Sequence, residues 1–189
     1  METAYQAINS LQQKIARQCA PVILGIKPAN LLTIDRDMAR QFVQLLQATD
    51  LEARFFHGSG QRQIWFLFRR DALEEVLEDE EKRNFLKEYG YEPEEGLEPL
   101  LSLMVRRFRF YKKGEIGFPH ELGIFLGYPL GDVKGFIENE GKNCLFIGYW
   151  KVYENEDQAR HTFHLYDFAK NFVLNLVQHG VDLEMVCRI

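Results

Sequence analysis

The sequence predicts an α+β fold, a single domain in which a mainly antiparallel sheet of about four to six strands packs with several helices. The length of 189 residues fits one globular domain. Hydrophobic residues make up 46% of the chain and charged residues 27%, which is enough apolar material for a packed core. Helical and strand-like segments are mixed without the regular alternation of parallel βαβ units. Because we find no internal repeat and no linker, we expect one domain over residues 1–189.

The N-terminal segment is expected to form a helix followed by short strands. Pro21 helps to end the helix predicted over residues 3–18, and the apolar runs 22–26 and 31–34 fit buried strands. The helical spacing is carried by Ala4, Ile8, Leu11 and Ile15.

A second helix and a hairpin are expected next. Asp35 can cap a helix over residues 36–48. The aromatic-rich runs 52–57 and 61–69 flank residues 58–60, Gly-Ser-Gly, which is a good hairpin signal. The second run is continuously apolar at its centre, so we expect it to be a central strand that is buried on both faces. The inward side chains of the helix are expected to be Met38, Phe42, Leu45 and Leu46.

Three helices are predicted in the middle of the chain. Asp71 and Asp79 can cap helices over residues 72–78 and 80–89, and the third helix covers residues 97–113. The apolar stripe of this third helix consists of Leu97, Leu100, Leu101, Met104, Phe108 and Tyr111.

The last third of the chain is predicted to mix helices and strands. Residues 118–139 are expected to form two short helices joined by residues 127–129. A strand is expected over residues 145–153, a long helix over residues 155–178 and a closing strand over residues 185–189.

Composition and motifs argue against several classes of protein. The formal charge of −5 argues against nucleic-acid binding, and the basic stretch 106–113 lies at a helix end, where cations are favoured in any protein. No segment approaches the ~20 apolar residues that cross a bilayer, so no membrane partner is expected. The chain contains no P-loop and no Cys-x-x-Cys motif, and the sequence therefore names no cofactor.

The N-terminus and the cysteines point to one compartment. The first residues have no basic region followed by an apolar one, so we expect no signal peptide. Three cysteines, an odd number, do not form a disulfide framework. A cytoplasmic location is the simplest expectation.

Two short motifs connect the chain to a family. The sequence Pro-His-Glu stands at residues 119–121, and Leu-Gly-Tyr-Pro stands at residues 126–129. With these motifs the chain closely resembles an uncharacterised bacterial family, domain of unknown function 3793, over nearly its whole length. The resemblance implies a small single-domain protein of the bacterial cytoplasm and no particular activity, so it assigns no catalytic residue. The segments that carry it are 19–21, 25–31, 118–129, 132–137 and 148–153.

A binding site is predicted around the helix pair at 118–137 and the strand at 148–153. If Pro119 opens a helix, His120 and Glu121 lie in its first turn, where free N–H groups gather and Glu121 can bond back to the Phe118 N–H. Several glycines in this segment suggest close backbone approach, either to the sheet or to a ligand. We therefore expect a small-molecule or protein-partner site; its polar contacts and apolar wall would come from His120, Glu121, Tyr128, Trp150 and Lys151.

Other interpretations remain open from the sequence. Cys19 could act as a nucleophile with His120 as base and Glu121 as its orienting partner, although a cysteine after a helix C-terminus has no obvious activating charge. The same residues could simply cap a helix and fill a core. The chain could also be a subunit whose apolar surface works only in an assembly. His161 and His164 lie three residues apart on the final helix, where a solvent-exposed pair is favoured over a metal site, and we predict none.

Overall fold

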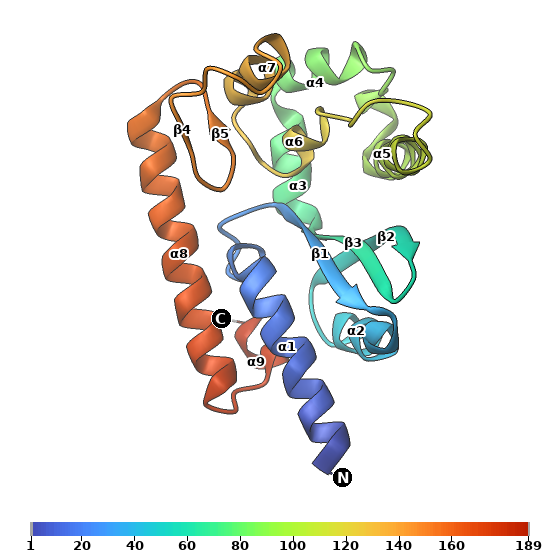
Figure 1. Cartoon of the computed structure of the whole chain (residues 1–189), viewed down its shortest axis with the longest axis vertical. Coiled ribbons are helices and arrows are strands. Elements are labelled where there is room, and N and C mark those ends of the chain that lie inside the picture. Colours follow the sequence, from blue (N-terminus) through green and yellow to red (C-terminus); the bar gives the residue numbers. More distant parts are fainter. Residues whose placement is uncertain (1, 189) are drawn as a thin grey trace. The chain divides into compact units, whose positions relative to one another are not determined.

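The computed structural model describes the backbone of residues 2–188 and the side chains of residues 10–188. The chain divides into two compact units, and each is described by itself. The first unit comprises Met1–Arg70 with Tyr166–Ile189, and the second comprises Asp71–Leu165 (Figure 1). Helices are present in both units, and all strand pairs of the described residues are antiparallel, which confirms the predicted α+β class. The single domain expected over residues 1–189 stays a prediction.

A three-stranded antiparallel sheet forms the centre of the first unit. Its strands are β1 (Ala29–Asp35), β2 (Leu51–Ser59) and β3 (Arg62–Arg69), in the order β1-β3-β2. The continuous apolar run of β3 therefore lies in the central strand, as expected. The β2–β3 hairpin is also confirmed, and Gly60 provides the positive φ of 57° that its turn requires.

Helix α1 (Glu2–Ile23) continues through Pro21, and the strand expected over residues 22–26 is therefore wrong. Cys19 and Val22 lie one turn apart and are both fully buried, so the apolar face of the helix extends beyond the proline. Pro21 removes only one backbone hydrogen bond at this position near the helix end, and burial of the last turn outweighs that loss.

The helix predicted over residues 36–48 begins as a 3₁₀ turn, η1 (Arg36–Met38), and continues as α2 (Ala39–Gln47). Asp35 stands at the N-cap position of this turn, but its side chain makes no capping hydrogen bond. Its carboxylate instead lies 2.8 Å from the ammonium group of Lys14 on α1.

The core of the first unit lies between one face of the sheet and the helices. It includes Leu32 on β1, Leu67 on β3, Phe42 on α2 and Val173 on α8 (Glu156–Gln178). Of the residues expected inward on α1, Leu11 and Ile15 are buried, whereas the side chains of Ala4 and Ile8 lie outside those described.

The strand expected over residues 185–189 is wrong for the described residues up to 188. A short helix, α9 (Leu183–Val186), stands there instead, because Leu183 and Val186 are three residues apart and a helical turn buries both. Ile189 lies outside the described residues.

The helices predicted in the middle of the chain are confirmed, and they open the second unit. Asp79 caps the second of them, since its carboxylate accepts two backbone N–H bonds at 2.9 and 3.1 Å. Asp71 lies in the first helical turn and not before it. These helices are α3 (Arg70–Glu78), α4 (Glu80–Lys87), η2 (Pro93–Glu95) and α5 (Leu97–Lys112).

The rest of the second unit differs from the expectation in two places. Pro119 precedes its helix instead of opening it. The strand predicted over residues 145–153 is a hairpin with its reversal at residues 148–150, where a side chain on Gly148 would clash with the Phe163 ring. The elements are α6 (Leu122–Phe125), α7 (Leu130–Glu138), β4 (Phe146–Ile147), β5 (Lys151–Val152) and α8 (Glu156–Gln178), which begins in this unit.

Candidate functional site

A buried carboxylate, Asp132, organises the candidate site in the second unit. It lies in the first turn of α7 and is 3% exposed. Its Oδ2 accepts a hydrogen bond from the Trp150 indole Nε1 at 2.6 Å. Its Oδ1 accepts the backbone N–H groups of Tyr153 and Glu154 at 2.7 and 2.9 Å. Three donors compensate the carboxylate for lost hydration, and together they fix residues 150–154 against the start of α7.

Trp150 and Tyr128 form a stacked aromatic pair. Their ring centroids are 5.0 Å apart and the ring planes are inclined by 29°. Trp150 also makes a T-shaped contact with Phe163 on α8, with a centroid distance of 4.5 Å. Burial raises the pKa of Tyr128, so that its hydroxyl stays neutral at physiological pH. The pair is therefore a rigid apolar wall with a neutral polar tip.

Glycines on α7 allow the following chain to approach the helix closely. A side chain on Gly131 would clash with the carboxylate of Glu154. A Cβ on Gly135 would lie 2.6 Å from Cβ of Tyr153. At these two positions, the absence of a side chain allows residues 153–154 to pack closely on the helix.

A cavity of about 290 Å³ lies beside the aromatic pair. Lys82 of α4 supplies a cation at its edge, and the Glu154 carboxylate supplies an anion. The starts of α7 and α8 both border it, so two helix N-termini meet the same space. Its lining consists of Lys82, Gly127, Tyr128, Pro129, Asp132, Trp150, Glu154, Asn155, Gln158, Ala159 and Thr162.

His120 and Lys151, which the sequence also suggested, do not line this cavity. Both contact Phe136 on α7: the His120 ring lies 4.8 Å from the Phe136 ring, and the Lys151 ammonium lies 5.6 Å from it. Lys151 also donates a hydrogen bond to the Gly141 carbonyl at 2.6 Å. Burial lowers the pKa of His120, against the opposing effect of the Glu121 charge. Burial therefore favours the neutral form of the His120 imidazole.

Glu121 is fully buried and does not bond back to Phe118. Because α6 starts only at Leu122, residue 121 lies in a turn before the helix. Its Oε1 instead accepts hydrogen bonds from Arg107 Nε at 2.5 Å and from the Tyr91 hydroxyl at 3.2 Å. Burial, reinforced by this negative charge, raises the pKa of Tyr91. Glu121 therefore ties the 118–121 turn to α5.

Cys19 lies in the first unit, whereas His120 and Glu121 lie in the second. The thiol is fully buried, and burial raises its pKa to about 12. The neighbouring Lys27 is buried as well, with its pKa lowered to about 8 by burial, and its ammonium donates to the Asn30 side chain at 2.6 Å. A thiol with this pKa stays protonated at neutral pH, a state that is a poor nucleophile.

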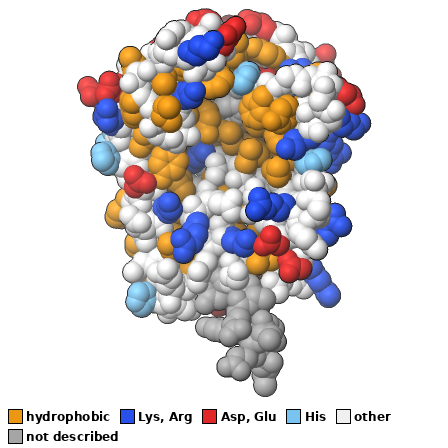
Figure 2. Space-filling model, in the orientation of Figure 1, with side chains coloured by type: hydrophobic (Ala, Val, Ile, Leu, Met, Phe, Trp, Pro, Cys, Tyr) orange, Lys and Arg blue, Asp and Glu red, His pale blue; other side chains and the backbone are white. Residues whose placement is uncertain are grey.

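The described residues contain no group of three His, Cys, Asp or Glu side chains that could hold a metal ion. His161 and His164 are both exposed on α8. Among the described residues, no helix has the length and apolar character that crossing a membrane requires. On the face shown in Figure 2, Lys and Arg side chains are spread among hydrophobic and acidic ones.

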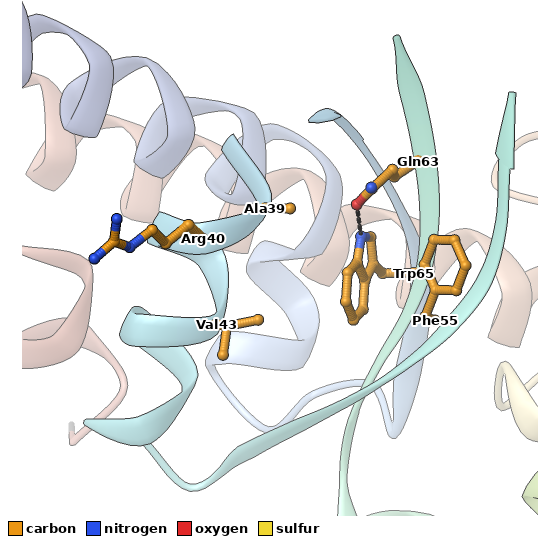
Figure 3. A pocket seen from close by; sticks show the side chains of 6 residues that line it. All are labelled: Ala39, Arg40, Val43, Phe55, Gln63 and Trp65. Atoms are coloured by element: carbon orange, nitrogen blue, oxygen red, sulfur yellow. Dashed lines mark hydrogen bonds between the residues drawn. The ribbon is translucent and has the colours of Figure 1, made fainter. Parts of the chain in front are cut away.

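A second, more open cavity of about 480 Å³ lies in the first unit, between α2 and the β2–β3 hairpin. Figure 3 shows Trp65 at its centre, with its indole N–H donating to Gln63 at 3.1 Å. Phe55 packs on the Trp65 ring with a centroid distance of 5.2 Å. The guanidinium of Arg40 points away from Trp65 (Figure 3), so the groove offers few polar contacts for a ligand.

The sequence singled out Tyr128 and Trp150, which line the cavity, but not Asp132 and Glu154, which line it as well. Asp132 lies inside a segment that carries the family resemblance, three residues after Pro129, and a carboxylate at this helix position was the available signal. The sequence gives no such signal for Glu154, because its side chain comes to lie beside Gly131 only when the chain is folded.

Comparison with known proteins adds the family and no function. No curated protein and no solved structure matches the chain. The family model described as a protein of unknown function (DUF3793) matches residues 15–187, which is nearly the whole chain. The PHE and LGYP motifs and this match agree, and the chain belongs to the DUF3793 family.

Proposed function

We propose that the protein binds a small molecule in the cavity beside Tyr128 and Trp150. The observation that carries the proposal is an aromatic pair that borders a cavity and is held in place by Asp132. Ligand sites combine apolar walls with a few fixed polar groups, and this lining does the same. At about 290 Å³ the cavity lies near the lower end of the common range of about 300–1,000 Å³, which favours a compact ligand.

We place this binding in the bacterial cytoplasm. The three cysteines are all free, which is typical of a reducing compartment. A cysteine-dependent enzyme finds no comparable support, because burial keeps the Cys19 thiol protonated.

The chain offers a direct optical test, since it has only two tryptophans, Trp65 and Trp150. In a Trp65→Phe variant the fluorescence of Trp150 reports on the cavity alone. This variant would be titrated with compact cationic, neutral and anionic probes, namely choline, agmatine, nicotinamide and benzoate. Native mass spectrometry of gently purified protein would detect a ligand that copurifies.

We expect at least one probe to change the Trp150 fluorescence saturably. Tyr128→Leu should then weaken its binding by about tenfold, the scale of one aromatic contact. Tyr111→Leu removes a ring outside the cavity and is the matched control. Two outcomes would overturn the proposal. One is saturable binding with the same affinity in Tyr128→Leu. The other is that no probe changes the fluorescence and no ligand copurifies.

A further inference from the structure

We propose that the ligand of this cavity is a small organic cation and that Glu154 recognises its charge. This inference rests on the proposed function, since it concerns the same cavity. It goes further because it names the chemical class of the ligand and the group that selects it.

The first argument is the balance of charge in the lining. Two carboxylates, Asp132 and Glu154, face one cation, Lys82. The Lys82 ammonium already lies 3.3 Å from the carboxylate of Asp79, and Asp132 is bound by its three donors. Glu154, in contrast, has no cationic partner among the described residues. The lining therefore carries an uncompensated negative charge at Glu154.

The second argument is the position of Glu154. Its backbone N–H is bonded to Asp132 Oδ1 at 2.9 Å, which fixes the chain at this residue, and its carboxylate lies in the space beside Gly131. The base of the side chain is therefore placed at the cavity before a ligand binds, which favours affinity.

The third argument concerns the helix N-termini, which would otherwise favour an anion. The chain already places its own acids there: Asp132 lies in the first turn of α7, and Glu156 and Asp157 lie in the first turn of α8. These carboxylates counter the positive ends of both helices and would repel a second anion. The group that would oppose a cation is the Lys82 ammonium, which is already paired with Asp79. A cation can also be attracted by the aromatic wall of Tyr128 and Trp150.

The probes are choline and its uncharged isostere 3,3-dimethyl-1-butanol, titrated into the Trp65→Phe protein. They have the same shape and differ in charge, so their affinity ratio isolates the electrostatic contribution. We expect choline to bind about tenfold more tightly than the isostere, the scale of a charge-assisted contact. Because Glu154 is accessible to solvent, this advantage should shrink as salt is added.

Two variants test the role of Glu154. Glu154→Gln removes its charge, and Gly131→Ala keeps the charge but displaces the carboxylate. Both should reduce choline affinity to that of the isostere. The matched controls are Glu138→Gln, an exposed carboxylate of α7 that does not line the cavity, and Gly117→Ala, at a position with open space around it. Circular dichroism and the Tm establish that each variant is folded.

The outcomes separate this inference from the proposed function. Equal affinity for choline and the isostere, a preference for benzoate, or unchanged choline binding in Glu154→Gln would overturn the cation assignment and leave the cavity as a ligand site. If no probe of any charge binds and nothing copurifies, the proposed function fails and this inference falls with it.

Discussion

At the scale of single residues, Asp132 matters most to the second unit. It is a buried carboxylate that makes three hydrogen bonds to a later segment of the chain, at 2.6, 2.7 and 2.9 Å. Buried charges are tolerated only when their partners are in place, and their removal leaves those partners unsatisfied. Asp132 therefore connects the stability of the unit with the orientation of Trp150.

We expect Asp132→Asn to destabilise the protein by about 2–4 kcal/mol, because an amide keeps the volume but replaces one acceptor by a donor. The urea midpoint of unfolding, followed by Trp150 fluorescence in the Trp65→Phe background, measures this change. Asp157→Asn, at an exposed position in the first turn of α8, is the control and should change stability by less than about 1 kcal/mol. If Asp132→Asn had the same urea midpoint as the parent protein, the three hydrogen bonds would contribute nothing to stability.

Three other buried groups, Cys19, Lys27 and Glu121, lie in environments that do not suit catalysis. Burial raises the pKa of Cys19 to about 12 and lowers that of Lys27 to about 8, so that each group is pushed towards its neutral form. Glu121 is similarly engaged, by Arg107 and Tyr91. Cys19 and Glu121 are candidates for catalysis in the sequence, whereas in the structure their environments suit a packed interior.

At the scale of elements, helix α7 is shaped by what packs on it. Gly131 and Gly135 lie one turn apart, and residues 153–154 occupy the space where side chains would stand. The two positions differ in what a methyl group would meet. At Gly131 it meets the far end of a flexible glutamate, and at Gly135 it meets the Cβ of Tyr153, which moves only with the backbone.

The same substitution is therefore expected to have different effects on stability at the two glycines. Gly135→Ala should destabilise the protein by about 1–3 kcal/mol, because overpacking outweighs the better helix propensity of alanine. Gly131→Ala should stay within about 1 kcal/mol of the parent, because the glutamate can swing away. Thermal unfolding followed by circular dichroism measures both. Equal destabilisation at the two positions would contradict the packing argument.

Short apolar segments account for the errors at this scale. Residues 22–26 and 185–188 were expected to form strands, but they form helical residues or turns. Residues 145–153 were expected to form one strand, but the chain reverses direction at Gly148. A run of about five apolar residues carries no reliable period, so neighbouring elements decide its conformation. Longer patterns were predicted well, as in α5 and in the β2–β3 hairpin.

At the scale of the whole molecule, the contact pattern divides the chain into two units, and each contains one tryptophan. Trp65 lies in the first unit and Trp150 in the second. The sequence predicts a single domain, and a single domain of this size usually unfolds in one cooperative transition.

We therefore expect the two tryptophans to report the same unfolding curve. Trp150→Phe leaves Trp65 as the reporter, and Trp65→Phe leaves Trp150. Each variant's fluorescence would be compared with its own circular dichroism signal in urea, which corrects for any change in stability caused by the substitution. Coincident curves within each variant support one domain, whereas two separate midpoints would show that the units unfold independently.

The sequence by itself determined the α+β class, the central position of β3, the long helices and the family, because each depends on local periodicity, turn residues or motifs. It also singled out Tyr128 and Trp150, which line the cavity. Only the tertiary structure decided that Asp132 binds Trp150, that Glu154 lies on Gly131, and that Glu121 pairs with Arg107. These contacts join residues 14 to 23 positions apart, and the chain brings them together only when its helices pack. Local pattern specifies the elements, and burial decides which polar groups meet between them.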